Sequence, residues 1–99
     1  MEKIGRAAAL EILQQHKHEL AEKYGVTRIG IFGSVARDEA TEQSDVDVVV
    51  EMIKPDLFFM VHIKNLLEAV MHRHVDIVRY RDRMNAFLKE RIDREAVYV

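Results

Sequence analysis

The sequence has 99 residues, 48% hydrophobic and 32% charged, with a net charge of −2, and this length predicts one small domain, residues 1–99, built around a single core. The absence of cysteine excludes a disulfide framework, a thiolate nucleophile and a cysteine zinc site, and the near-neutral charge predicts no direct nucleic-acid binding. No apolar stretch approaches the ~20 residues that span a bilayer and the N-terminus lacks the apolar segment of a secretion signal, so we expect a cytoplasmic protein with no membrane partner.

A long helix is predicted at the beginning of the chain, over residues 2–24. Leu10, Leu13 and Leu20 recur at helical spacing, which is typical of a helix with one packed face. Gly25 follows, and glycine commonly ends a helix because it adopts the left-handed conformation without strain. We expect one face of this helix to pack on the core and the other to contact solvent.

A buried strand, a tight turn and a short helix are predicted next. The strand covers residues 27–32, Gly33 and Ser34 form the turn, and residues 35–40 are helical. A Gly-Ser turn between a strand and a helix start offers backbone N–H groups and a hydroxyl to an anion, and the helix dipole favours negative charge there. The turn therefore predicts a phosphate-binding site.

A second strand begins with two carboxylates, Asp45 and Asp47. Side chains two residues apart in a strand lie on the same face, so the two acids lie side by side. The opposite face carries an apolar row, namely Val46, Val48, Val50 and Met52. Two neighbouring like charges are unfavourable unless a cation lies between them, and carboxylate oxygens suit a hard divalent ion such as magnesium. The acids therefore predict a metal site that faces a cleft, while the valine row faces a core.

The next predicted element is a helix over residues 57–71, after a break at Pro55. Its core stripe consists of Met60, Ile63, Leu67 and Val70. Further apolar residues spread well beyond that stripe, namely Leu57, Phe58, Phe59, Val61 and Leu66. Two interpretations stay open: the helix is wedged deeply into a small core, or it presents an exposed patch to a partner protein.

The C-terminal part is predicted to contain a strand over residues 74–80, a helix over 83–96 and a short strand over 97–99. The alternating basic residues after the third strand are Arg79, Arg81 and Arg83. They either contact phosphates or a partner's acidic groups, or they form a solvated basic edge. The sequence as a whole predicts an α+β domain with a small mixed sheet of three or four strands, helices packed on one face and the acids on the other.

The spacing of these motifs resembles a known signature. Gly33-Ser34, ten further residues and Asp45-x-Asp47 resemble the G-S-x10-D-x-D pattern of the DNA polymerase β-like nucleotidyltransferase superfamily, which has a palm fold. Gly-Ser-Val-Ala-Arg is close to the form found in its minimal nucleotidyltransferase (MNT) domains. The resemblance covers most of the chain, from about residue 26 to residue 99. Asp38 departs from it, since many relatives have glycine there.

The resemblance also implies which residues form a metal site. A third Asp comes from a later, neighbouring strand in this family, and Asp76 is the only matching position. Asp45, Asp47 and Asp76 are therefore the implied catalytic residues and the implied ligands of two Mg²⁺ ions. The resemblance also implies that Asp76 helps to activate the acceptor hydroxyl.

The implied nucleotide is ATP, and its terminal phosphates are expected at Gly33 and Ser34. Arg37 follows three residues after Ser34 and lies on the same helix face. Arg37 either stabilises phosphate charge or is an ordinary surface arginine, and both interpretations stay open.

The family resemblance extends to a partner. Polymerases of this superfamily carry additional domains that hold the acceptor, and 99 residues leave no room for them. Stand-alone domains of this size resemble the antitoxin of a two-gene toxin–antitoxin pair, which transfers AMP from ATP to a tyrosine of a HEPN-domain ribonuclease toxin. The alternative is a non-catalytic binding module that neutralises its partner by contact alone.

Another catalytic reading of D-x-D is a phosphatase or glycosyltransferase. In those enzymes the apolar strand precedes the acids, whereas here Val48, Val49 and Val50 follow Asp45 and Asp47. That order favours the nucleotidyltransferase arrangement.

Overall fold

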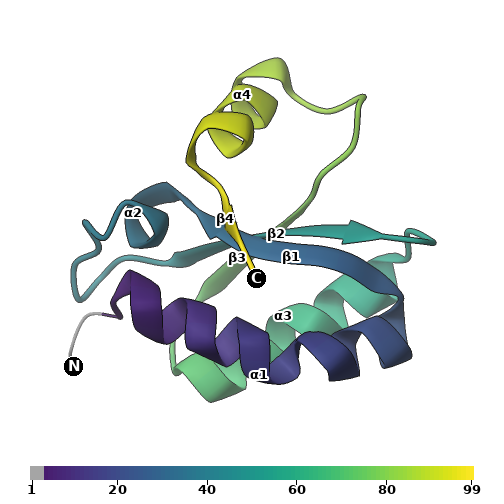
Figure 1. Ribbon diagram of the computed structural model, residues 1–99, viewed down its shortest axis with the longest axis horizontal. Helices are drawn as coiled ribbons and strands as arrows, with labels where there is room; N and C mark the ends of the chain where they lie inside the picture. The colour runs from purple at the N-terminus through teal and green to yellow at the C-terminus, as the bar shows by residue number, and fades with distance from the viewer. Residues whose placement is uncertain (1–3) are drawn as a thin grey trace.

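The computed structural model describes residues 4–99. Within this part of the chain the elements alternate between helices and the strands of one sheet (Figure 1). In chain order they are α1 (Arg6–Tyr24), β1 (Val26–Phe32), α2 (Gly33–Ala36), β2 (Val46–Met52), α3 (Leu57–Met71), β3 (Val75–Arg79), α4 (Ala86–Glu95) and β4 (Val97–Tyr98).

The sheet is mixed and has the strand order β3-β2-β1-β4. β1 pairs antiparallel with β2 and with β4, whereas β2 and β3 are parallel and are connected through α3. Asp47 is the register partner of Phe32 on one side and of Asp76 on the other. The α+β class and the small mixed sheet are therefore confirmed, and the pairing carries two predicted acids to the same part of the sheet.

The two faces of the sheet are covered by different helices. α1 and α3 lie on one face, and α4 lies on the opposite face (Figure 1). The alternation along β2 matches this division, because Val46, Val48 and Val50 pack with α1 and α3 while Val49 packs with Phe32 and with Ile92 of α4. Each strand residue thus faces one of two cores.

The position of α4 differs from the expectation that the helices share one face. β3 and β4 are the two edge strands of the sheet, so the chain must cross the sheet between them. α1 and α3 already fill one face, and α4 crosses the other, where Ile92 buries fully and Leu88 packs beside it. The physical result is that α4 lies on the face that carries the acids.

The end of α2 and the beginning of α1 are linked by Asp38. Its carboxylate accepts a hydrogen bond from the Arg6 N–H at 3.0 Å, and Asp38 has a positive φ of 59°, a conformation that glycine and, less often, Asp adopt. This conformation gives a physical reason for glycine at the same place in many relatives. The predicted helix over 2–24 begins at Arg6, and its positions 2 and 3 lie outside the described residues.

The sequence left two interpretations of residues 57–71 open, a helix wedged into the core and a helix with an exposed apolar patch. Each describes one side of α3. Asp56 caps the helix by accepting hydrogen bonds from the N–H groups of Phe58 and Phe59. The inner side is formed by Ile63, Leu67 and Met71, which are buried. The outer side leaves Leu57 83%, Phe58 78% and Val61 53% exposed. Phe59 instead packs on the Tyr24 ring at 5.3 Å between centroids.

In residues 4–99 no helix is long and apolar enough to cross a membrane.

Candidate active site

Three predicted carboxylates gather where the parallel strands β2 and β3 begin. Asp47 and Asp76 are register partners on neighbouring strands, and Asp45 lies directly before β2. The Val46 N–H donates to the His74 carbonyl at 3.0 Å, which holds the residues before both strands together. The structure therefore brings together the three acids that the sequence analysis named, on the face that α4 partly covers.

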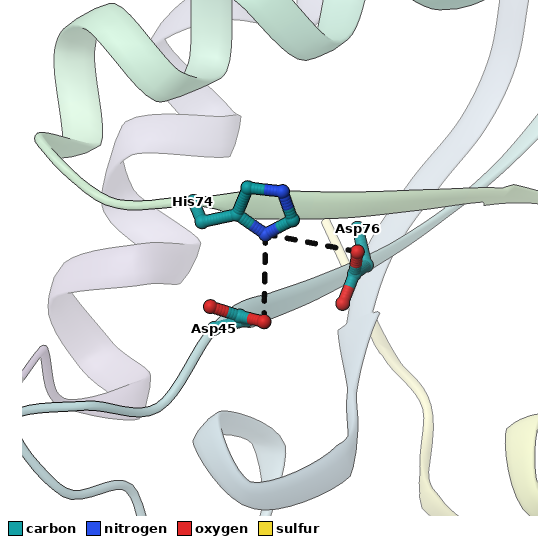
Figure 2. Close-up of side chains that lie close together, drawn as sticks. All are labelled: Asp45, His74 and Asp76. Atoms are coloured by element: carbon teal, nitrogen blue, oxygen red, sulfur yellow. Dashed lines mark ion pairs between the residues drawn. The ribbon is translucent and has the colours of Figure 1, made fainter.

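His74 lies between two of these acids, as Figure 2 shows. Its Nδ1 is 3.4 Å from Asp45 Oδ2 and 3.7 Å from Asp76 Oδ1, and its Nε2 is 3.9 Å from Glu68 Oε2. About half of each side chain in the trio is exposed. The imidazole therefore lies close enough to both carboxylates to interact with them while all three groups stay accessible to a ligand.

The donor set of this trio fits a divalent ion. One ligand atom from each of Asp45, His74 and Asp76 lies within 4.8 Å of the others. The carboxylate oxygens of Asp45 and Asp76 are the ligands that Mg²⁺ prefers, whereas the imidazole of His74 suits zinc and other transition metals. Asp47 is not part of this trio, but its carboxylate is close enough to Asp76 and Asp45 for their charges to affect its pKa.

The environment of Asp47 raises the pKa of its carboxyl above the ordinary value. Partial burial is the main cause, and the negative charge of Asp76 is the next, with Asp45 and Glu95 adding to it. Arg91 of α4 acts in the opposite direction. An ionised Asp47 is thus disfavoured in the free protein, and a bound cation would relieve the repulsion.

Gly33 is required at the turn because of its backbone and its neighbour. Its φ is +76°, and a Cβ at this position would collide with the Asp47 carboxylate and lie 3.4 Å from Arg91 Nη2. A residue with a side chain would be strained in this conformation. The predicted phosphate turn therefore lies directly against a predicted metal ligand, and Ser34 follows it in a half-buried position.

The N–H of the turn is engaged by the last residue of α4. Gly33 N–H donates to Glu95 Oε1 at 3.1 Å, and Arg37 Nη1 donates to the same oxygen at 2.9 Å. Arg37 is 40% exposed and also approaches Glu39, with Nε 3.6 Å from Oε1. The carboxylates of Glu95 and Glu39 therefore orient Arg37 beside the turn.

Sequence reasoning missed three residues of this region, His74, Arg91 and Glu95. A signal for His74 was available in the sequence, since His74 lies two residues before Asp76, just as Asp45 lies two residues before Asp47. Arg91 and Glu95 gave no local signal, because their place depends on α4 crossing the acid face. Carboxylates close to a Gly-Ser turn are the kind of arrangement that suits phosphoryl or nucleotidyl transfer, in which divalent ions stabilise the attacking and leaving oxygens.

Comparison with known proteins defines the family. The family model described as "Nucleotidyltransferase domain" matches residues 13–99. The protein adenylyltransferase MntA of Thermococcus cleftensis is 40% identical over 89 residues, which cover 89% of each chain. A solved structure described as a "putative minimal nucleotidyltransferase" is 35% identical with a TM-score of 0.69 and covers 89% of this chain and 93% of its own.

A second structural neighbour has the same fold at low identity. It is the complex of a tri-AMPylated HEPN toxin with an MNT antitoxin from Shewanella oneidensis, with 15% identity, a TM-score of 0.69, and coverage of 94% of this chain and 70% of that one. The chain belongs to the nucleotidyltransferase family and is a minimal nucleotidyltransferase domain. It is therefore an enzyme of the nucleotidyltransferase class.

Proposed function

We propose that the protein transfers the adenylyl group of ATP to a tyrosine hydroxyl of a HEPN-domain toxin and acts as its antitoxin. The observation that supports this most is the position of Asp47, which lies against Gly33 and is the register partner of Asp76. That arrangement can hold a nucleotide's phosphates and divalent ions together. The relative MntA, named a protein adenylyltransferase, supports adenylyl transfer, and the HEPN–MNT complex supports the partner.

The proposed reaction is an in-line displacement at phosphorus. The tyrosine oxygen bonds to the α-phosphorus of ATP, the bond between the α-phosphorus and its bridging oxygen to the β-phosphate breaks, and pyrophosphate leaves. Asp76 takes the hydroxyl proton. Ser34 and the turn at Gly33 bind the terminal phosphates, and Arg37 stabilises their negative charge.

Two Mg²⁺ ions are the proposed cofactors, with Asp45, Asp47 and Asp76 as the side chains that would hold them. Such ions neutralise the phosphates and stabilise the attacking and leaving oxygens. His74 is the additional group within reach of two of these acids. The pKa of Asp47 is raised because burial and the neighbouring carboxylates make its charged form unfavourable in the metal-free protein.

The acceptor must contribute much of its own binding surface, because the described residues form only the sheet and its covering helices. An apolar area for a partner exists on α3, where Leu57 and Phe58 are largely exposed. Leu57 also lines a groove of about 540 Å³ between the beginnings of α3 and α4, together with Arg79 and Arg81. This surface suits a partner that offers apolar side chains flanked by acidic ones.

Substoichiometric silencing should distinguish an enzyme from a contact inhibitor. One molar equivalent of this protein with ATP and Mg²⁺ is expected to inactivate ten equivalents of its HEPN-domain toxin, because each enzyme molecule turns over repeatedly. Asp45→Asn should bind the toxin but fail to silence it. The measurement is the toxin's ribonuclease activity, followed by its intact mass, which should increase by one adenylyl group for each modified tyrosine.

A different outcome would support the binding module. Inhibition that follows the one-to-one ratio, without a mass change and without an effect of Asp45→Asn, contradicts adenylyl transfer. Asp82→Asn is the matched control, since Asp82 is 100% exposed and its contact with Lys89 is at 4.0 Å. The control should silence the toxin like the wild type.

Phe58 is the expected anchor for the partner. Phe58→Ala should weaken toxin binding by roughly 2 kcal/mol or more, because aromatic side chains often dominate interface energies. Ile53→Ala is the control, since Ile53 is 80% exposed and does not line the groove. Calorimetric titration of the toxin into each variant measures the change, and an unchanged affinity of Phe58→Ala would place the interface elsewhere.

A further inference from the structure

One carboxylate oxygen connects three parts of the candidate site. Glu95 is the last residue of α4, and its Oε1 accepts hydrogen bonds from the Gly33 N–H at 3.1 Å and from Arg37 Nη1 at 2.9 Å. Gly33 and Arg37 are both proposed to bind phosphate. Glu95 therefore contacts the phosphate-binding part of the site without being predicted to contact the nucleotide.

The surroundings of Glu95 keep it in place. Its side chain is only 12% exposed, and a carboxylate this buried needs charged or hydrogen-bonding partners. Arg91 Nε lies 3.9 Å from Oε1 and Arg94 Nη2 lies 3.7 Å from Oε2. The backbone is held as well, because α4 closes through the Ala96 N–H to the Ile92 carbonyl at 2.9 Å and the chain continues directly into β4, which pairs with β1.

The contact uses a small part of the binding capacity of Arg37. A guanidinium has five N–H donors in a fixed planar arrangement, and the hydrogen bond to Glu95 uses Nη1. The side chain is still 40% exposed, so other donors remain accessible to a phosphate. An arginine that is already oriented loses less conformational freedom when a ligand binds.

We propose that Glu95 is a positioning residue for the nucleotide, which holds the Gly33 turn and the Arg37 guanidinium in the orientation that receives the phosphates; this rests on the proposed function. Glu95 acts through these two residues and is not itself a catalytic residue. The same contacts allow an opposite effect, in which the carboxylate competes with phosphate for the two donors. The two effects change ATP affinity in opposite directions.

The substitution Glu95→Gln distinguishes the positioning effect from competition with phosphate. The amide oxygen of Gln can still accept from the Gly33 N–H, so the fold is kept, but the charge that holds Arg37 is lost. We expect ATP with Mg²⁺ to bind about tenfold more weakly, because hydrogen bonds to charged groups are the stronger ones. Adenosine lacks phosphates and should bind with unchanged affinity. Calorimetry with both ligands measures the difference, and a merely structural role would weaken both.

Glu90→Gln is the matched control. Glu90 lies on the same helix, is 70% exposed and pairs with Arg94 at 3.4 Å, so it loses the same charge without contact to the turn. Its ATP affinity should stay within about twofold of the wild type, as is usual for exposed ion pairs. Thermal unfolding of both variants checks that each is folded.

A double-mutant cycle tests whether Glu95 acts through Arg37. Arg37→Gln changes an exposed residue and should itself weaken ATP binding, and Glu95→Gln should add little in that background. Tighter ATP binding in Glu95→Gln, unchanged binding, or fully additive losses would each overturn the positioning role. Wild-type protein that does not bind ATP would refute the proposed function as well, whereas wild-type transfer with an unaffected Glu95→Gln variant would refute only this inference.

Discussion

Asp47→Asn is expected to remove adenylyl transfer, by a factor on the order of 100 or more, because the site loses a charged metal ligand where charge develops in the transition state. Asn has nearly the same shape, so the register contacts with Phe32 and Asp76 should persist. Transfer from labelled ATP to the toxin measures activity. Calorimetry with nucleotide present measures Mg²⁺ binding, and equal magnesium affinity in both proteins would contradict the metal role.

The same substitution should leave the metal-free fold unchanged or slightly more stable. The pKa of Asp47 is raised from 3.8, so ionisation of this carboxyl costs folding free energy. The cost is absent below the ordinary pKa, grows as the pH rises through the raised pKa, and is constant above it. Asn avoids the cost, so its advantage in the free energy of unfolding should appear over that range and persist at neutral pH.

Urea unfolding in a chelator at several pH values tests this dependence. Asp82→Asn is again the control, because its fully exposed carboxyl should give no such advantage. A metal-free Asp47→Asn protein that is clearly less stable than the control at neutral pH would show that the Asp47 carboxylate supports the fold.

Gly33→Val is expected to have the second large effect. The left-handed backbone at φ +76° and the adjacent Asp47 carboxylate leave no place for a side chain. Such strain costs roughly 1–3 kcal/mol before the steric conflict is added, so we expect a loss of at least about 2 kcal/mol in the free energy of unfolding. ATP binding should fall below detection. Denaturant unfolding and calorimetry measure the two effects.

Two other substitutions make the result interpretable. Gly5→Ala is the control, since Gly5 precedes α1 in an extended conformation and an added Cβ would meet Asp38 Oδ1 at an ordinary 3.7 Å. Ser34→Ala should keep the stability and weaken ATP binding mildly, because it removes only a hydroxyl. Unchanged ATP affinity in both Gly33→Val and Ser34→Ala would show that the turn has only a structural function.

The local pattern of the chain was sufficient to predict most elements and the named acids. Alternation along 45–52 separated the carboxylates from the valine row, and the structure shows the same division between two faces. The bounds of the helix over 57–71 are predicted correctly, since Pro55 and the capping residue Asp56 directly precede the segment and an apolar stripe runs along it. The short helix α2 begins at Gly33, so it includes the two residues that were predicted as a turn before it. It ends at Ala36, earlier than the predicted residue 40, because Asp38 turns left-handed.

The sequence by itself determined the α+β class, the Gly-Ser turn and the spacing of Asp45 and Asp47, because strand alternation, turn chemistry and helix periodicity act within a few residues. The tertiary structure alone decided that Phe58 is exposed while Phe59 packs on Tyr24. It also decided that Glu95 reaches Gly33 across 62 residues of sequence. Such contacts depend on which edge of the sheet β4 pairs with and which face α4 then covers, and this choice follows from the packing of the whole core and not from any local period.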